Sequence, residues 1–162
     1  MREEGRCLCG EVVFAATGDP VRITQCYCRF CQRATGSIVF REPIFLKEAF
    51  EIADGSPKVF SLMSEGSGKR VNVHFCDACG TKIYLSFERF PDVVGVYGGA
   101  FDDPDWYMAR GVDHRCIFLD FAPRGAIVPA GIKTYREHVQ GADGATNEAT
   151  VFDAPHTVGD KS

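Results

Sequence analysis

The chain has 162 residues, of which 45% are apolar, and a formal net charge of −4. A chain of this length and composition can bury one hydrophobic core, so we expect a single domain. The acidic charge gives no electrostatic reason to bind nucleic acid or an anionic membrane, and no apolar run approaches the roughly 20 residues that cross a bilayer. Because the chain begins with charged residues rather than an apolar signal segment, we expect a soluble, cytoplasmic protein.

Short apolar and alternating runs follow one another along the chain, with Gly, Pro, Asp and Ser between them. Their β-branched and aromatic content predicts a mainly β fold of antiparallel strands with few short helices. Short helical pieces are expected only after Cys28, at residues 103–108 and at residues 132–139. The predicted strands lie at residues 11–16, 37–46, 58–63, 70–75, 82–87, 93–99 and 116–121.

The C-terminal stretch differs in composition from the rest of the chain. From Gln140 onward small and polar residues dominate, and only scattered apolar side chains are available to offset the entropy of ordering. We therefore predict one zinc-binding domain at residues 1–139 and a polar, flexible tail at residues 140–162.

The chain contains eight cysteines, and seven of them fall into short-spaced motifs. In a reducing cytosol, thiols bind metal or do chemistry rather than form disulfides. Neighbours this close can converge on one ion but are poorly placed to pair with each other. The motifs are CxC at Cys7 and Cys9, CxCxxC at Cys26, Cys28 and Cys31, and CxxC at Cys76 and Cys79.

The four-cysteine cluster joins Cys7 and Cys9 to Cys76 and Cys79. A glycine follows each pair, which permits a tight turn whose backbone amides donate to sulfur. Four thiolates complete the tetrahedron of a zinc ion and leave no vacant position for a substrate. We therefore expect a structural zinc ion here.

The three-cysteine cluster, Cys26, Cys28 and Cys31, supplies one thiolate fewer than a closed site needs. Three protein ligands with one open position are typical of catalytic zinc, which lowers the pKa of a bound thiol or water. Alternatively, Cys116 or His114 closes the tetrahedron and makes this a second structural site. The residues alone leave both interpretations open.

Five motifs occur in a fixed order across residues 5–125: GRCLCGEVVF, CYCRFCQRATGS, FCDACGTKIY, VYGGAFDDPDW and HRCIFLDFAP. In this order and spacing they resemble the glutathione-dependent formaldehyde-activating enzyme (GFA) family, to which the centromere protein V domain also belongs. The resemblance implies a tent-like, mainly antiparallel β fold built around two zinc ions. It also implies a structural ion on the four-cysteine cluster and a catalytic ion on the three-cysteine cluster.

The same resemblance implies a reaction. Family members are assigned to combining formaldehyde with glutathione into S-hydroxymethylglutathione, which is a carbon-sulfur lyase reaction run in reverse. We therefore expect a zinc-dependent lyase that joins a small, glutathione-like thiol to a formaldehyde-like aldehyde. The partners are then small molecules, and exposed strand edges permit a homodimer.

Several side chains near the three-cysteine cluster are candidates for substrate binding. Glutathione carries two carboxylates, which a guanidinium matches in geometry, and Arg33 occupies a basic position of the family motif. Tyr27 and Ser37, with Thr35, are candidates to donate a hydrogen bond to the developing alkoxide. Trp106 is considered both as a pocket wall and as a core aromatic residue.

The sequence also departs from the family pattern. Tyr27 stands where relatives commonly carry His, Gln32 where they carry Arg, Cys116 where they carry His, and Arg124 where they carry Trp. These changes fall at positions expected to lie near the substrate more than at the predicted metal ligands. A non-catalytic binding module with two closed zinc sites is therefore kept as the alternative, and a thiol-based sensor is the third class.

Overall fold

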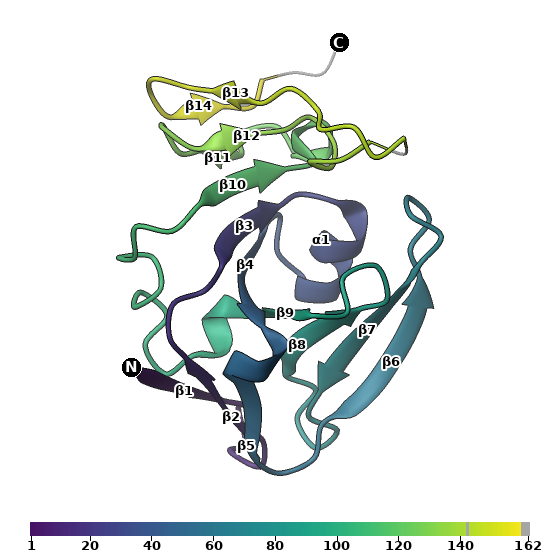
Figure 1. Cartoon of the computed structure of the whole chain (residues 1–162), viewed down its shortest axis with the longest axis vertical. Helices are drawn as coiled ribbons and strands as arrows, with labels where there is room; N and C mark the ends of the chain where they lie inside the picture. The colour runs from purple at the N-terminus through teal and green to yellow at the C-terminus, as the bar shows by residue number, and fades with distance from the viewer. Residues whose placement is uncertain (142, 160–162) are drawn as a thin grey trace. The chain divides into compact units, whose positions relative to one another are not determined.

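The computed structural model describes residues 1–141 and 143–159, and it confirms the mainly β fold (Figure 1). The chain forms two compact units, each built from two separate stretches of sequence. Unit 1 comprises Met1–Ile23 and Glu42–Val112, and unit 2 comprises Thr24–Arg41 and the described residues from Asp113 onward. None of the helices in the described residues is long and apolar enough to cross a bilayer.

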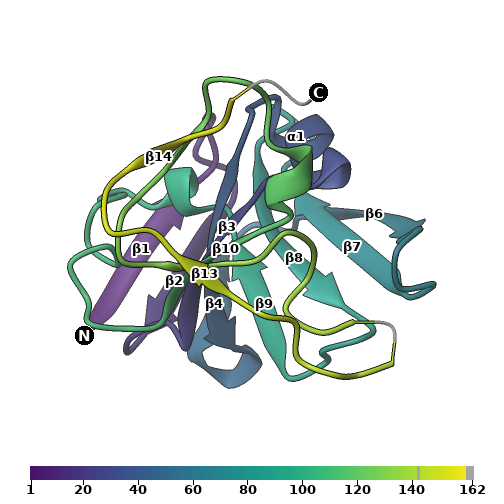
Figure 2. The same cartoon turned by 90° about the horizontal axis from the view of Figure 1, so that it is seen from above.

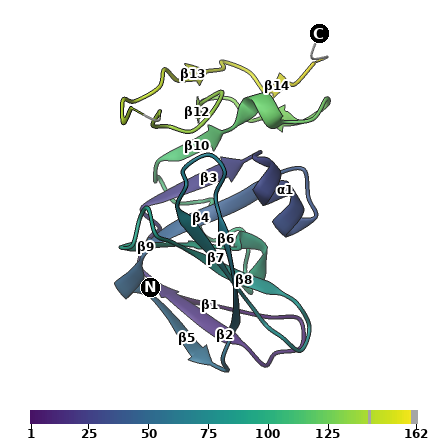
Figure 3. The ribbon, with the colours of Figure 1, turned by 90° about the vertical axis from the view of Figure 1, so that its right-hand side faces the viewer.

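Unit 1 contains a small antiparallel sheet in the order β1-β2-β5 (Figure 3). Gly5 of β1 lies opposite Phe14 of β2, and a Cβ atom at Gly5 would come within 2.2 Å of the Phe14 ring. Only glycine therefore fits this position of the register. The strands are β1 (Arg2–Arg6), β2 (Val13–Thr17) and β5 (Phe50–Asp54).

The other strands of unit 1 follow the antiparallel order β4-β9-β8-β7-β6, with β4 belonging to this unit from Glu42 onward, and β7, β8 and β9 lie side by side in Figure 2. The predicted strands at residues 58–63, 70–75 and 82–87 coincide with β6, β7 and β8 to the residue. Two short 3-10 turns, Lys47–Ala49 and Gly98–Ala100, connect strands. The strands are β4 (Phe40–Leu46), β6 (Lys58–Met63), β7 (Arg70–Phe75), β8 (Lys82–Phe87) and β9 (Val93–Val96).

Aromatic side chains dominate the core of unit 1. The ring of Phe101 meets those of Phe14 and Trp106 edge-on, with centroids 5.1 Å and 5.4 Å away. Phe45 stacks on Trp106 in the same buried cluster, which also contains Cys7 and Cys76. Trp106 is therefore a core residue, which is one of the two roles considered for it.

Unit 2 has the strand order β13-β12-β10-β3, with the last three residues of β3 belonging to this unit, and a separate antiparallel pair β11-β14. β10 and β12 are parallel, whereas β12 and β13 are antiparallel. The helix predicted after Cys28 is confirmed as α1 (Arg29–Thr35), which ends at Gly36 with φ 70°. The strands are β3 (Arg22–Cys26), β10 (His114–Ile117), β11 (Ile127–Val128), β12 (Lys133–Thr134), β13 (Thr150–Val151) and β14 (His156–Thr157).

The helix predicted at residues 132–139 is wrong. Ile132 and Thr134 are buried while Lys133 between them is exposed, which is the two-residue period of a strand. The backbone N–H of Tyr135 donates to the carbonyl of Cys116, so this segment pairs along β10. Residues 103–108, also predicted as helical, form turns.

The strand predicted at residues 116–121 is shorter than expected. β10 ends at Ile117, and Phe118 then adopts a left-handed conformation with φ 61°. A 3-10 turn, η3 (Leu119–Phe121), follows. The backbone therefore changes direction inside an apolar run that has no Gly or Pro to signal it.

Part of the stretch predicted as a tail pairs with the rest of unit 2. β13 and β14 lie within it, and Val158 is buried beside Val128 and Ala126. The N–H of Val158 donates to Ala126 O at 2.8 Å, and the N–H of Gly125 donates to Val158 O at 2.8 Å. The flexibility of residues 140–162 stays a prediction.

Candidate metal centres

The four-cysteine cluster lies in unit 1, between the turn after β1 and the turn after β7. The four sulfur atoms lie within 4.8 Å of one another. Cys9 Sγ is 3.4 Å from Cys7 Sγ and 3.6 Å from Cys76 Sγ. Sulfurs at about 2.3 Å from a tetrahedral zinc ion are about 3.8 Å apart, so this arrangement fits zinc.

Two similar turns create this cluster. Cys7 N–H donates to Val12 O and Cys76 N–H donates to Thr81 O, so each cysteine motif closes a short loop. The glycines after the two pairs have φ values of 81° and 73°, which confirms why glycine follows each pair. A register shift in the β7-β8 ladder between His74 and Phe75 precedes Cys76 and redirects the chain into its turn.

Hydrogen-bond donors surround the sulfurs of the four-cysteine cluster. The N–H of Val12 donates to Cys7 Sγ at 3.2 Å. The Thr81 hydroxyl lies 3.1 Å from Cys79 Sγ, and hydrogen bonding from Thr81 lowers the pKa of Cys79 to about 5. These donors stabilise thiolates, which are the form that binds a metal.

The three-cysteine cluster lies in unit 2, where β3 meets α1. Cys26 ends β3, Cys28 is the N-cap of α1, and Cys31 lies in its first turn. The N–H of Cys31 donates to Cys28 Sγ at 3.3 Å, and the three sulfurs lie within 4.8 Å of one another. The three sulfurs therefore converge because a strand is followed closely by the first turn of a helix.

The three thiols share hydrogen bonds that favour one thiolate. Hydrogen bonds from Cys26 and then Cys31 lower the pKa of Cys28 to about 3. Hydrogen bonds within the cluster raise the pKa values of Cys26 and Cys31. Cys26 and Cys31 are buried and Cys28 is partly exposed, so the thiol whose pKa is lowered belongs to the least buried of the three residues.

Neither Cys116 nor His114 belongs to the three-cysteine cluster in the described part of the chain. Cys116 is fully buried in a core cluster with Tyr27, and burial raises the pKa of its thiol to about 12. Cys116 therefore packs with Tyr27 and is not grouped with the three cysteine sulfurs.

His114, the other candidate for closing the site, is partly buried on β10. Burial, and to a smaller extent the Arg41 guanidinium, lowers the pKa of His114. Its Nε2 atom is buried and has no hydrogen-bond partner among the described residues.

The predicted substrate-binding residues lie around α1. Arg33 and Ser37 are exposed. Tyr27 is 1% exposed, and its hydroxyl donates to Ile127 O at 3.3 Å, so the geometry disfavours it as a substrate contact. The Thr35 hydroxyl donates to Cys31 O at 2.8 Å and accepts from the N–H of Ser37, so it caps the helix end.

Gln32 was given no role from the sequence. Its side-chain amide donates to the carbonyl of Tyr27, inside the loop of the three-cysteine cluster, and to the carbonyl of Phe121 in η3, and no spacing pattern signals these contacts. The one indication in the sequence is that the residue differs from the Arg commonly found there.

The sequence profile of the family described as glutathione-dependent formaldehyde-activating enzyme matches residues 2–114. The chain belongs to this family. The match covers most of unit 1 and the part of unit 2 that contains the three-cysteine cluster. Both cysteine clusters, as grouped in the structure, are compatible with zinc.

Two individual proteins are similar to this chain. A Halomonas elongata protein, named provisionally as a glutathione-dependent formaldehyde-activating enzyme, is 24% identical over 102 residues, which cover 61% of this chain and 65% of that protein. The chain therefore spans about two thirds of this relative's length. A crystal structure of a Rhodobacter sphaeroides protein has a TM-score of 0.50 at 17% identity, covering 68% of this chain and 98% of that one. This second likeness concerns the fold alone.

Proposed function

We propose that this protein is a zinc-dependent carbon-sulfur lyase that condenses a small, glutathione-like thiol with a formaldehyde-like aldehyde at the three-cysteine cluster. The observation that carries the proposal is the ligand count. Three thiols converge in unit 2, and no fourth Cys, His, Asp or Glu of the described residues joins them. A three-ligand zinc site leaves a position for an exogenous ligand.

In the proposed reaction the thiol sulfur forms a bond to the aldehyde carbon. The thiol loses its proton, the sulfur lone pair attacks the carbon, and the electron pair of the C=O bond moves to oxygen. Protonation of that oxygen gives the hydroxymethyl thioether, so the atoms of thiol and aldehyde are all retained. Zinc, when bound by Cys26, Cys28 and Cys31, would supply an open coordination position and lower the pKa of the thiol that occupies it.

The chain itself would bind and orient the reactants. Arg33, exposed in the last turn of α1, offers a forked donor to a carboxylate of a glutathione-like substrate. Ser37, exposed two residues after the helix, offers a hydroxyl that can donate to the developing alkoxide. Holding the thiol and the aldehyde together would lower the activation free energy through proximity, by on the order of several kcal/mol in oriented systems.

The four-cysteine cluster has a different role in this proposal. Its four thiols would complete the coordination of one zinc ion and leave no position for a substrate. We propose that this ion is structural and stabilises unit 1. The protein would then hold two zinc ions, one structural and one catalytic.

The chemistry also suggests where the protein works. All eight cysteines are free, and two groups of them are arranged to share a metal ion. Thiols of this kind persist in a reducing compartment. We propose a cytoplasmic location, and small molecules as the partners of the reaction.

The proposal is tested by zinc stoichiometry together with glutathione titration, in the wild-type protein and in Cys116→Ser. We expect two zinc ions in both proteins, saturable glutathione binding in both, and formation of S-hydroxymethylglutathione observed by NMR when formaldehyde is added. Loss of one zinc ion in Cys116→Ser, with no glutathione binding to the wild type, would favour the non-catalytic module with two closed sites. Arg33→Gln should weaken glutathione binding while both ions remain.

A further inference from the structure

The side-chain amide of Gln32 bridges two backbone segments of unit 2. Its Nε2 atom donates to the carbonyl of Tyr27 at 2.6 Å and to the carbonyl of Phe121 at 3.1 Å. Its Oε1 atom accepts from the guanidinium of Arg29. The two carbonyls can only accept and the guanidinium can only donate, so the orientation of the amide is fixed by its partners.

Tyr27, which receives the shorter of these bonds, lies between two predicted metal ligands, Cys26 and Cys28. Its N–H donates to Ile117 O at 3.2 Å and its hydroxyl donates to Ile127 O at 3.3 Å. With the bond from Gln32, each polar group of Tyr27 is held. The loop that carries the first two cysteines is therefore fixed to its neighbours at three points.

Gln32 directly follows Cys31, the third cysteine of the cluster. Its bond to Tyr27 thus joins the residue after the third cysteine to the residue between the first two. This contact limits how far Cys31 can move from Cys26 and Cys28. The bond to Phe121 also ties the same loop to η3, which the left-handed Phe118 directs back toward α1.

We propose that Gln32 is a positioning residue, whose amide holds segment 26–31 in the arrangement that receives a metal ion. This rests on the proposed function only in taking the three-cysteine cluster as a metal site. Residues that orient metal ligands through hydrogen bonds typically cost 10–100-fold in metal affinity when they are replaced. Arginine at this position would also supply N–H donors, which glutamate and methionine lack.

The test compares Gln32→Met, Gln32→Glu and Gln32→Arg with the wild type by chelator competition for zinc. We expect the three-cysteine cluster to bind its zinc ion more weakly than the four-cysteine cluster does, and to bind it about 10–100-fold less tightly still in the Met and Glu variants. The Arg variant should retain affinity close to wild type, and the ion of the four-cysteine cluster should be unchanged throughout. Gln140→Met, an exposed residue of unit 2, is the matched control and should have no effect.

A second measurement separates positioning from a general effect on folding. In the cobalt-substituted protein, the ligand-field bands of the three-cysteine cluster should shift in Gln32→Met and stay in place in Gln32→Arg. Wild-type affinity and bands in Gln32→Met or Gln32→Glu, with or without a lower melting temperature, would overturn the inference. If wild-type protein binds two ions but no thiol, the proposed function fails while this comparison still stands; a single bound ion would overturn both.

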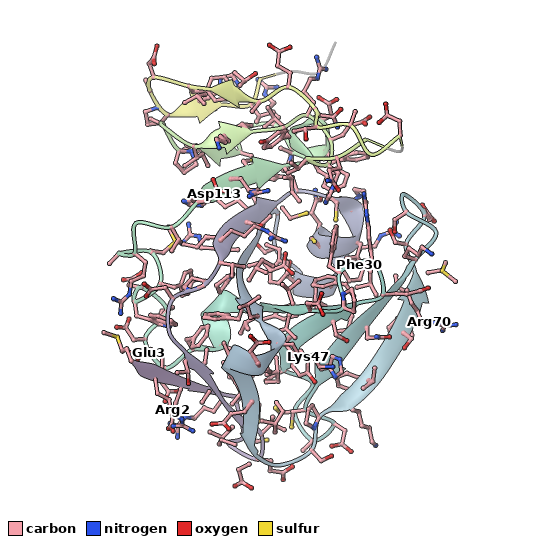
Figure 4. All side chains as sticks on the ribbon, viewed as in Figure 1. Arg2, Glu3, Phe30, Lys47, Arg70 and Asp113 are labelled. Atoms are coloured by element: carbon pink, nitrogen blue, oxygen red, sulfur yellow. The ribbon has the colours of Figure 1, made fainter. Side chains whose placement is uncertain are left out.

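A second inference concerns β6, which lies at the end of the strand order in unit 1. Its outer edge has no strand partner among the described residues, and its pairing with β7 is regular over six residues. Val59, Phe60 and Met63 are each more than half exposed. Figure 4 shows the side chains of the β6-β7 hairpin, with Arg70 labelled where β7 begins. Unpaired edges without a bulge or proline tend to pair with another strand.

The sequence of β6 is complementary to itself. An antiparallel pair of two copies centred on Ser61 places Val59 opposite Met63 and Phe60 opposite Leu62 of the second copy. The same register sets Lys58, which forms an ion pair with Asp77 of its own copy, opposite the uncharged Ser64 of the second copy. Apolar side chains thus face apolar ones, and no like charges oppose each other.

We infer that two copies of this chain pair through β6. Ser61→Lys places two lysines directly opposite each other only in the dimer, and Ser61→Glu does the same with two carboxylates. We expect a concentration-dependent dimer by sedimentation, because a six-residue edge is at the small end of specific interfaces. Each charged variant alone should be monomeric, a mixture of the two should restore the dimer, and Ser61→Ala is the control. A wild type that stays monomeric at millimolar concentration, or a dimeric Ser61→Lys variant, would overturn this inference.

Discussion

Removing Cys76 should unfold unit 1, because the four-cysteine cluster stabilises it through a bound ion. Cys76 is 1% exposed and packs in the same core cluster as Cys7 and Phe14. Structural zinc contributes about 10–16 kcal/mol in small zinc domains, whereas a whole domain is stable by only about 5–15 kcal/mol. A serine hydroxyl left in this apolar core costs only about 1–3 kcal/mol. Loss of the ion is therefore the larger effect.

Comparison of Cys76→Ser with Cys9→Ser separates these two contributions. Cys9 is exposed, so its replacement removes a ligand without placing a hydroxyl in the core. If the ion governs stability, both variants should lose the unit 1 transition in thermal unfolding followed by circular dichroism, and both should lose one zinc ion by elemental analysis. Ala78→Ser, an exposed change in the same turn, is the control. A folded Cys76→Ser variant with two zinc ions, or a Cys9→Ser variant as stable as wild type, would refute this reasoning.

Three further predictions concern single side chains. Cys116→Ser should lower the free energy of unfolding by about 1–3 kcal/mol, because a hydroxyl replaces a fully buried thiol, while elemental analysis should still find two zinc ions; loss of one would identify Cys116 as a ligand. Burial lowers the pKa of His74, so the unfolded chain binds a proton at a higher pH than the folded chain does. The contribution of neutral His74 to the free energy of unfolding should therefore be fully present above pH about 6.5 and should fall as the pH drops below it. In denaturant titrations His74→Phe should reduce this dependence of the unfolding free energy on pH, and the same dependence in both proteins would contradict the prediction. Val158→Ala should lower the free energy of unfolding by about 1–2 kcal/mol, because it removes methyl groups from the unit 2 core. The backbone amides of residues 143–159 should exchange hydrogen more slowly than those of an unstructured chain. If neither effect is found, the flexible tail that the composition predicts is supported.

The strands of unit 1 could be predicted because their side chains alternate or are continuously apolar. β6, β7 and β8 coincide with the predicted segments for this reason. β1 could not be predicted, since its sequence REEGR is almost entirely charged and its pairing depends on Gly5 admitting the ring of Phe14. The two-residue strands of unit 2 carry too few residues for a periodic signal, so residues 132–139 were expected to be helical.

The spacing of the cysteines was sufficient to predict both clusters, but it could not determine whether Cys116 belongs to the three-cysteine cluster. Short motifs place their own sulfurs together because a single turn connects them, and both clusters are found as grouped. Whether Cys116 joins the three-cysteine cluster depends on which face of its strand it occupies, and that depends on tertiary packing against Tyr27. The bridge made by Gln32 likewise depends on η3, which follows an unsignalled left-handed residue, Phe118.

The central claim is that the three-cysteine cluster holds a metal ion with a position open to an external thiol. Glutathione titration of the cobalt-substituted protein tests this most directly, because thiolate-to-cobalt absorption reports the number of bound sulfurs. We expect one equivalent of glutathione per protein to raise the absorption of that cluster by roughly one third, from three sulfurs to four, and to leave the absorption of the four-cysteine cluster unchanged. A spectrum that already shows four sulfurs at both clusters, and that glutathione does not change, would contradict it.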